Sequence, residues 1–312
     1  MQIFYGTENF NSVTSSVVTV GTFDGVHLGH KKVLNLLKSE AYTNGFNSVV
    51  VTFSAHPRIV LKQNITNLKL LSTIDEKINL LKKYGIDQLI IIPFDKDFAD
   101  LQANQFISKY LKNIINANTI IVGYDHHIGK GREADSDAIT KAASAEGIKV
   151  LTIIPEYIEG EAVSSTRIRN ALATGNIKLA NICLGYKYNF NGKVVEGNKL
   201  GSKIDFPTAN LLPTDNMKLI PAKGVYAVNV KVNGVIYKAM MNIGFRPTIN
   251  NKNKINKIIE VHIFNFNKYI YNDIICVYIV DKIRDEKKFD SLNALKNQLV
   301  IDKITALNIL SI

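Results

Sequence analysis

The sequence predicts an α/β domain built on a doubly wound parallel sheet, followed by a small antiparallel, all-β barrel domain that ends in a helix. Three observations favour this order. The chain has 312 residues, enough for about two domains. Short Val- and Ile-rich runs alternate with helical stretches in its first part. Near residue 182 this pattern changes, and the segments that follow have the β-branched composition of strands. We therefore expect domains over residues 1–182 and 183–312.

In the first domain, five short apolar runs have the continuous hydrophobicity of strands that are buried on both faces of a parallel sheet. They span residues 16–22, 47–53, 87–93, 118–124 and 148–155. Stretches with helical periodicity separate them, over residues 30–41, 73–85 and 101–115. Strands and helices that alternate at this spacing predict βαβ units.

In the second domain, five segments have the alternation or the β-branched composition of antiparallel strands. They span residues 193–197, 224–232, 235–244, 257–266 and 273–283. Asn-Gly pairs at 191–192 and 233–234 predict tight turns. We expect a barrel that is closed by a helix over about 286–299 and joined to the first domain by a linker over 172–186.

The net charge of +11 raises the question of a nucleic-acid partner. The lysines are scattered, however, and often stand beside Asn and Ile, as in residues 250–259. The sequence has no arginine-rich stripe and no interleaving of aromatic and basic residues of the kind that binds single strands. We therefore expect no nucleic acid, and a small polyanionic substrate instead.

The composition is that of an ordinary soluble globular protein, with 46% hydrophobic and 21% charged residues. No apolar run approaches the ~20 residues that span a bilayer. The first ten residues lack a basic region followed by an apolar stretch, which predicts no signal peptide. The two cysteines, Cys183 and Cys276, fit no metal spacing. These features predict a cytoplasmic protein with buried thiols and no membrane partner.

Two histidines follow the first predicted strand, in the stretch GTFDGVHLGH over residues 21–30. The carboxyl end of such a strand is where open α/β sheets bind ligands. His27 and His30 share one face of the first turn of a helix, whose N-terminus favours a phosphate. Gly21 permits a tight turn, and Gly29 leaves room between the rings. The pattern predicts imidazoles that stabilise charge on a phosphate chain. The alternative is a pair of partly exposed surface histidines.

A second segment, SSTRIRNALATG over residues 164–175, follows the fifth predicted strand and opens another helix. An ordinary capped helix explains its hydroxyl residues, Ser164, Ser165 and Thr166. It does not require Arg167 and Arg169 in the first turn, where they oppose the helix dipole. A bound polyphosphate would offset that opposition.

The predicted barrel carries the glycine-rich stretch GNKLGSKIDFPTANL over residues 197–211. If this segment is extended, Thr208 and Asn210 point the same way. A hydroxyl and an amide oxygen side by side suit Mg²⁺, although a turn followed by a strand is the simpler interpretation. Glu260 lies within an apolar strand pattern at 258–266. It is either a solvated, outward-facing residue or a catalytic base.

The first stretch resembles the HxGH signature of nucleotidylyltransferases. Further segments occur along the chain in the order VTFSAHP, VGYDHHIGKGR, SSTRIR, DFPTANL, GVYAV, NIGFRPT, EVHIFNF and IRDEKKF. Together, this series resembles the bifunctional riboflavin kinase/FMN adenylyltransferases, the bacterial FAD synthetases, almost from end to end. The resemblance implies that the first domain adenylylates FMN with ATP, giving FAD and pyrophosphate. It implies that the barrel phosphorylates riboflavin with ATP, giving FMN, and that Mg²⁺ takes part.

The resemblance also implies the roles of individual residues. The catalytic residues would be His27, His30, Arg167 and Glu260. The ATP- and flavin-binding residues would be Gly21, Thr22, Phe23, Asp24, Gly29, Asp125, Ser164, Ser165, Thr166, Arg169, Gly197, Gly201, Pro207, Thr208, Asn210 and Arg284. Thr208 and Asn210 would also hold the metal.

Three positions depart from the family pattern. Thr22 stands where many members have asparagine, and two histidines occur in residues 124–129 where aromatic residues are common. Asp205 replaces the usual glycine before Phe206 and Pro207. These changes bear on flavin contacts and on kinase efficiency.

Two other function classes remain open on sequence grounds. One is a nucleotidylyltransferase with a different acceptor, whose barrel is only a binding module. The other is a non-catalytic flavin- or nucleotide-binding protein, with an RNA role suggested by its basic composition. In each case we expect a monomer or a weak homo-oligomer.

Overall fold

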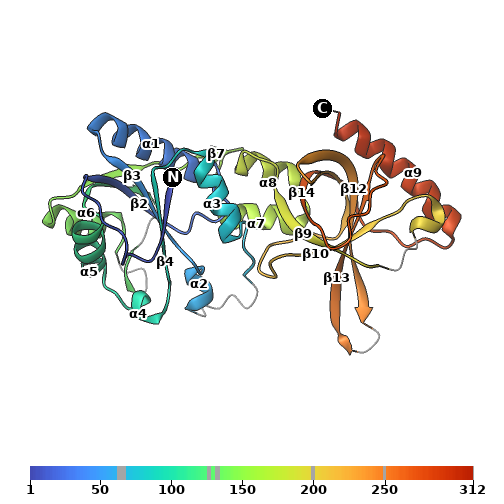
Figure 1. The fold of residues 1–312 in the computed structure, drawn as a ribbon, viewed down its shortest axis with the longest axis horizontal. Coiled ribbons are helices and arrows are strands. Elements are labelled where there is room, and N and C mark those ends of the chain that lie inside the picture. Colours follow the sequence, from blue (N-terminus) through green and yellow to red (C-terminus); the bar gives the residue numbers. More distant parts are fainter. Residues whose placement is uncertain (62–67, 125–127, 131–133, 198–200, 249–250, 312) are drawn as a thin grey trace. The chain divides into compact units, whose positions relative to one another are not determined.

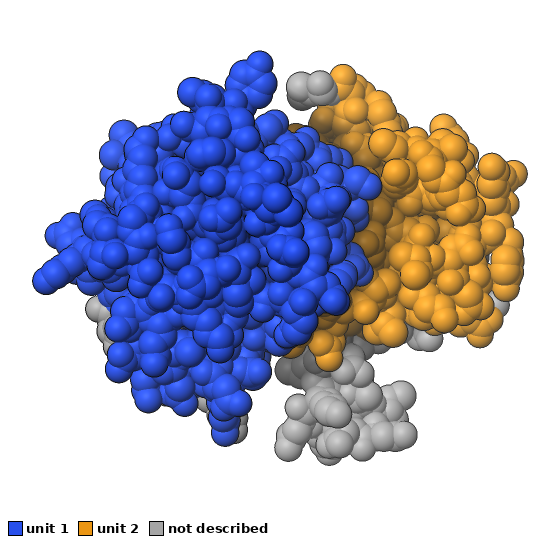
Figure 2. Space-filling model, turned by 60° about the vertical axis from the view of Figure 1, so that its left-hand side comes forward, with its two compact units in different colours: residues 1–164 blue, residues 165–312 orange. Residues whose placement is uncertain are grey.

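The chain folds into two compact units, residues 1–164 and 165–312, in a computed structural model (Figures 1 and 2). The structure describes residues 1–61, 68–124, 128–130, 134–197, 201–248 and 251–311. The boundary between the units lies before the 182/183 boundary expected from the sequence, and that expectation stays a prediction.

A six-stranded parallel sheet forms the centre of the first unit, with the order β1-β4-β3-β2-β5-β6. Its strands are β1 (Gln2–Tyr5), β2 (Ser16–Val20), β3 (Asn47–Phe53), β4 (Gln88–Ile92), β5 (Ala117–Gly123) and β6 (Lys149–Ile153). The five predicted strands are confirmed. The prediction missed β1, because this edge strand has only four residues and they are mostly exposed.

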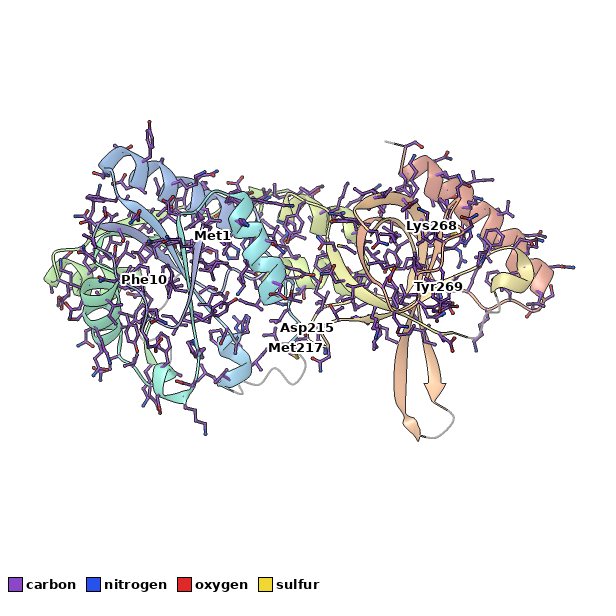
Figure 3. The ribbon with its side chains drawn as sticks, viewed as in Figure 1. Met1, Phe10, Asp215, Met217, Lys268 and Tyr269 are labelled. Carbon is purple, nitrogen blue, oxygen red and sulfur yellow. The ribbon has the colours of Figure 1, made fainter. Side chains whose placement is uncertain are left out.

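Helices cover both faces of this sheet, as the continuous apolar runs predict. One face packs against α1 (Leu28–Asn44) and α3 (Ile74–Lys83). The other packs against α5 (Ala103–Phe106), a π-helix (Ile107–Ile114) and α6 (Ser136–Ala145), and Phe10 lies in this second core (Figure 3). The shorter elements are α2 (Pro57–Val60), α4 (Lys96–Ala99) and the ribbon of β7 (Tyr157–Ile158) and β8 (Glu161–Ala162).

The order of the strands places a switch point between β2 and β5. From β2 the chain builds outward through β3 and β4, and from β5 it builds outward on the other side to β6. The connections therefore diverge at these two neighbouring strands. Crevices at such points are where open α/β sheets bind ligands. Residues 21–27 leave the end of β2 at this place.

The second unit contains a closed barrel with the order β10-β13-β12-β11-β14-β9. Its strands are β9 (Asn189–Val195), β10 (Ala209–Pro213), β11 (Gly224–Val232), β12 (Val235–Thr248), β13 (Asn251–Ile263) and β14 (Ile274–Arg284). All pairs are antiparallel, which confirms the predicted barrel. Asn233 and Gly234 form the expected turn, both with positive φ (46° and 87°). The turn predicted at 191–192 is wrong, because both residues pair within β9.

Helices α7 (Ser165–Thr174) and α8 (Ile177–Leu184) occupy the segment where the sequence suggested a linker. The buried Asn181 donates through Nδ2 to the carbonyl oxygen of Ile279 at 3.0 Å and accepts from the Tyr188 amide at 2.7 Å. Because both bonds of this buried amide are to the backbone of the barrel unit, they fix α8 to that unit. These helices therefore belong to the barrel unit.

The last helix, α9 (Leu292–Ile309), begins and ends later than predicted. Ser291 caps it by accepting a hydrogen bond from the Ala294 amide, which places the start after residue 290. Its second half packs Ala306 and Leu307 onto the outside of the barrel, beside Ala227 and Met240. This contact extends the helix well past residue 299.

Candidate functional site

The loop after β2 and the start of α1 hold the two histidines against each other. His27 is the N-cap of α1, and its Nδ1 accepts a hydrogen bond from the His30 amide at 3.4 Å. The rings are stacked, with centroids 3.6 Å apart and planes 19° from parallel. Because His27 Nδ1 is an acceptor, the neutral ring carries its proton on Nε2. The pair therefore stands at a helix N-terminus, as the sequence predicts.

The backbone of this loop is strained. Phe23 and Val26 are buried and have φ values of 46° and 38°, which residues other than glycine rarely adopt. The Phe23 ring supports His30, with centroids 5.0 Å apart. A Cβ at Gly21 would lie 3.1 Å from the same ring, so the glycine makes room for it.

His30 is electrostatically distinct from an exposed histidine. Burial lowers its pKa well below the ordinary value, and electrostatic interactions with His27 and Lys77 lower it further. Its Nδ1 is buried and has no hydrogen-bond partner among the described residues. At neutral pH this ring is a neutral imidazole with one N–H to donate.

Asp24 holds the loop to the segment before α3. Its carboxylate accepts from the amides of Leu71 and Ser72, at 3.0 and 2.9 Å, and from the Ser72 hydroxyl. Its side chain is only 2% exposed. Asp24 therefore shapes the site, and its predicted contact with ATP or flavin stays a prediction.

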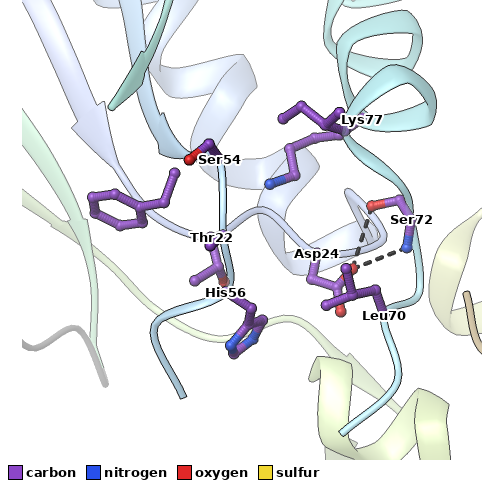
Figure 4. Close-up of a pocket in the computed structure, with 10 residues that line it drawn as sticks. Thr22, Asp24, Ser54, His56, Leu70, Ser72 and Lys77 are labelled. Carbon is purple, nitrogen blue, oxygen red and sulfur yellow. Dashed lines mark hydrogen bonds between the residues drawn. The ribbon is translucent and has the colours of Figure 1, made fainter. Parts of the chain in front are cut away.

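A pocket opens beside this loop (Figure 4). Thr22 and Asp24 line it from the loop after β2, Ser54 and His56 from the segment between β3 and α2, and Lys77 from α3. Lys77 points from its helix toward Thr22 and Asp24 (Figure 4). This lysine is not among the predicted site residues, because it lies outside the recognised motifs and has the spacing of a surface lysine in an amphipathic helix.

The hydroxyl and arginine residues predicted to bind phosphate fall on either side of the boundary between the units. Ser164 ends the first unit, directly after Val163, whose carbonyl oxygen is 3.5 Å from the position of a Cβ on Gly29. Ser165, Thr166, Arg167 and Arg169 lie in the first two turns of α7. Their role with the histidine pair stays a prediction, and Asp125 lies outside the described residues.

In the barrel unit, the glycine-rich stretch and the Pro-Thr-Ala-Asn segment lie against each other. The Asn210 amide covers Gly197 so closely that a Cβ there would overlap it. A Cβ on Gly201 would overlap the carbonyl oxygen of Phe206 and would lie 3.6 Å from Thr208 Oγ1. Gly201 is therefore required by the close approach of the Phe206 backbone, whereas a side chain at Gly197 would displace the Asn210 amide.

Glu260 lies opposite Asn210 in the pairing of β13 with β10, and opposite Asn242 in the pairing of β13 with β12. Side chains at paired positions share a face. A carboxylate is thus flanked by two amides in one row across three strands. Asn242 was missed by the sequence analysis, although it belongs to the NIGFRPT motif.

This row lies on the outer face of the barrel. Val261 and Ile259, which alternate with Glu260, are fully buried with Met241 and Ile243 of β12. His262, two residues from Glu260, packs instead against Phe206, with centroids 5.1 Å apart.

His262 fastens the loop that precedes β10. Its Nδ1 lies 2.7 Å from the carbonyl oxygen of Pro207, so Nδ1 carries the proton and donates it. Burial lowers the pKa of His262, and the bond to Pro207 opposes this shift. The ring therefore positions the segment that carries Thr208 and Asn210.

Two other predicted features of this unit have structural partners. Arg284, at the end of β14, donates to both carboxylate oxygens of the buried Asp302 in α9, at 2.8 and 2.7 Å. Its predicted contact with ATP or flavin stays a prediction. Asp205 has a φ of 65°, which explains why glycine is usual there, and it pairs with Lys296 of α9.

The described residues hold no cluster of three His, Cys, Asp or Glu side chains that would bind a metal ion by itself. Among the described helices, none is long and apolar enough to cross a membrane.

Comparisons with known proteins agree with this division into two sites. Residues 10–167 match the sequence model of the FAD synthetase family, and residues 184–310 match that of the riboflavin kinase family. Proteins named bifunctional riboflavin kinase/FMN adenylyltransferase include one from Bacillus subtilis, 36% identical over 95% of this chain and 93% of its own. Another, from Escherichia coli, is 35% identical over 98% of this chain and 97% of its own.

A solved structure shows the same fold over the whole length. The crystal structure of a Streptococcus pneumoniae protein, named a macrolide-efflux protein, has a TM-score of 0.91 at 33% identity and covers 99% of both chains. Neither of the two family descriptions that match this chain, FAD synthetase and riboflavin kinase, mentions macrolide efflux. On its full-length relatives and both domain matches, the chain belongs to the family of bifunctional riboflavin kinase/FMN adenylyltransferases.

Proposed function

We propose that this chain makes FMN from riboflavin and ATP in its barrel unit, and FAD from FMN and ATP in its first unit. The observation that carries the proposal is the contrast between the two sites. One presents imidazoles at a helix N-terminus, and the other presents a carboxylate between two amides. The motif series and the family support the substrates.

In adenylyl transfer, an oxygen of the FMN phosphate bonds to the α-phosphorus of ATP, and the bond to the leaving pyrophosphate breaks. The attacking phosphate is already an anion, so this step needs no general base. The task of the protein is to hold the reactants in line and to stabilise charge. His27 offers an Nε2–H and His30 a neutral imidazole to the phosphate chain, beside the amides that open α1.

In the kinase step, the 5′-hydroxyl of riboflavin bonds to the γ-phosphorus of ATP, and ADP leaves. A neutral alcohol attacks better when a base accepts its proton. We assign that role to Glu260, with Asn210 and Asn242 orienting its carboxylate. His262 is a weaker candidate, because its Nδ1–H is engaged by Pro207.

Mg²⁺ fits the oxygen atoms at the start of β10. The Thr208 hydroxyl and the Asn210 amide are hard donors on one short segment, beside a glycine cradle that a Cβ would fill. Magnesium usually arrives with ATP and takes only one or two protein ligands. Its chemistry here would be to neutralise the phosphate oxygens during transfer.

The remaining expectations belong to this proposal. We place the kinase domain over residues 183–312 and expect small-molecule partners and a cytoplasmic location. Both cysteines are thiols, which supports a reducing compartment.

The test is incubation of the full chain with riboflavin, ATP and Mg²⁺, with flavins separated by chromatography. FMN should accumulate first and FAD should follow. Supplied FMN should give FAD and pyrophosphate without riboflavin. FMN without FAD would contradict the first site, and FAD only from supplied FMN would contradict the second and leave the barrel as a binding module.

A further inference from the structure

A buried lysine occupies a core position of α3. Lys77 is 8% exposed and shares the inward face of the helix with Leu81, one turn later. A lysine side chain is almost never fully buried in a protein unless its charge is paired. It also lies in the first turn of α3, where a positive charge opposes the helix dipole. An apolar residue at this position would suit both the core and the helix better.

The lysine is connected to the loop after β2. Its Nζ donates to Thr52 Oγ1 at 3.2 Å, and the Thr52 hydroxyl donates to the carbonyl oxygen of Thr22 at 3.3 Å. Thr52 is fully buried at the end of β3. This chain of hydrogen bonds joins α3 to the backbone between Gly21 and Phe23.

The charge of Lys77 also acts on the histidine pair. It is one of the causes that lower the pKa of His30, after burial and His27. Asp24 favours the charged form of Lys77, and His56 lines the same pocket. Asp75 and Glu76 precede Lys77 on its own helix.

We propose that Lys77 is a positioning residue for adenylyl transfer, which holds the backbone of Thr22 through Thr52 and keeps a positive charge beside His30. The proposal rests on the FMN adenylylation proposed above. A buried charge that the fold holds in place needs no reorganisation when the reaction begins. It also keeps His30 neutral, so that this ring remains a hydrogen-bond donor with an unprotonated nitrogen.

A consequence is a pH limit on one of the two activities. Burial lowers the pKa of Lys77 to about 8, and Asp24 only partly opposes this shift. The charge is therefore present below about pH 8 and is lost as the pH rises through that value. FAD formation should lose rate over this range, while riboflavin phosphorylation, whose site lies in the barrel, should not follow it.

The experiment compares the full chain with Lys77→Met, Lys77→Arg and a control, Lys82→Met, which removes an exposed lysine from the same helix. For Lys77→Met we expect kcat for FAD formation to fall by ~10–10², the cost of a misplaced reacting group, with KM values within about threefold. The fall above pH 8 should disappear. Lys77→Arg should keep more activity and move the fall to higher pH. Lys82→Met should behave as the parent.

Two outcomes would overturn the proposal: a parental kcat in Lys77→Met, or a reduced kcat with the alkaline fall unchanged. If Lys77→Met does not fold, Thr52→Val tests the hydrogen-bond chain with the lysine retained, and parental FAD formation in that variant contradicts the proposal. FAD formation by the unaltered chain is measured first. Its absence contradicts the proposed function, whereas its presence with no effect at Lys77 contradicts only this inference.

Discussion

The two sites of this protein are built from opposite chemical groups. In the first unit, nitrogen bases and a buried cation gather at the carboxyl ends of parallel strands: His27, His30 and Lys77. In the barrel, oxygen and amide groups form a row across antiparallel strands: Asn210, Glu260 and Asn242. The first set is suited to stabilising anions, and the second to accepting a proton and holding a cation.

This difference follows from the nucleophile that each proposed reaction uses. A phosphate that attacks another phosphate brings negative charge with it, so the protein must supply positive charge and donors. A hydroxyl brings a proton that must leave, so the protein must supply a base. Because both sites lie in one chain, each activity is a built-in control for variants of the other.

The largest effect should come from the carboxylate of the barrel. Glu260→Gln keeps the shape of the side chain and removes the base, so we expect FMN formation to fall by ~10²–10⁴. FAD formation from supplied FMN should be unchanged, as measured by chromatography of both products. Glu286→Gln is the matched control, since that carboxylate covers Gly244 near Asn242. A parental kinase rate in Glu260→Gln would make Glu260 a solvated strand residue.

Next in size is the loss of an imidazole from the first site. His30→Ala removes a donor but keeps the N-cap on His27, and we expect FAD formation to slow by ~10²–10³. Riboflavin phosphorylation should continue at its parental rate. If steady-state assays show undiminished FAD synthesis, the two histidines are ordinary surface residues and not part of the site.

A smaller effect should follow from filling the glycine cradle of the barrel. Gly197→Ala places a methyl group where the Asn210 amide now lies, so that amide must move. We expect kcat/KM for ATP in the kinase reaction to fall by ~10–10², with FAD formation unaffected. Gly192→Ala, which lies in β9 just before Gly197 in the chain, is the control, because its Cβ would meet Leu211 rather than Asn210. Equal kinetics for both variants would argue against a role for Asn210.

The smallest effect concerns stability. Lys77→Met replaces a buried charge by an apolar chain of similar length, and we expect the free energy of unfolding to rise by ~1–3 kcal/mol at pH 7. The pKa of Lys77 is about 8 in the fold and ~10.4 in an unfolded chain. The cost of burying this charge therefore lowers the free energy of unfolding by its full amount below pH 8. This cost becomes smaller as the pH rises toward 10. Calorimetry at pH 7 and pH 10 measures the difference. A variant less stable than the parent at pH 7 would mean that Lys77 is a structural residue.

Some features of the site were predictable because they are local. His27, His30 and the glycines between the strand and the helix form one turn of chain, so their spacing alone indicates a helix N-terminus at the end of a strand. Each motif of the series is likewise a short stretch of chain, so the series could indicate both a nucleotidylyltransferase and a riboflavin kinase activity. The five buried strands were likewise visible, since burial on both faces requires a continuous apolar run.

Other features depend on which segments meet in space. In the sequence, Lys77 has the pattern of a surface lysine. It becomes buried and donates to Thr52 only because α3 packs beside β3 and the loop after β2. Asn242 becomes a neighbour of Glu260 only through the register of two strands. The bond of Asn181 to the barrel is what turns an apparent linker into part of the second unit.

The sequence by itself therefore determined the fold class and the pairing of two activities, because periodicity and local motifs carry that information. The residues that it assigns to the two sites stay predictions. Only the tertiary structure decided which lysine is buried, which face of the barrel holds Glu260, and how far α9 extends past residue 299. These depend on contacts between residues far apart in the chain, which no local pattern encodes. Burial then changes their chemistry, since the same ammonium group is an ordinary surface charge in water and a perturbed, positioned one in the pocket beside Asp24.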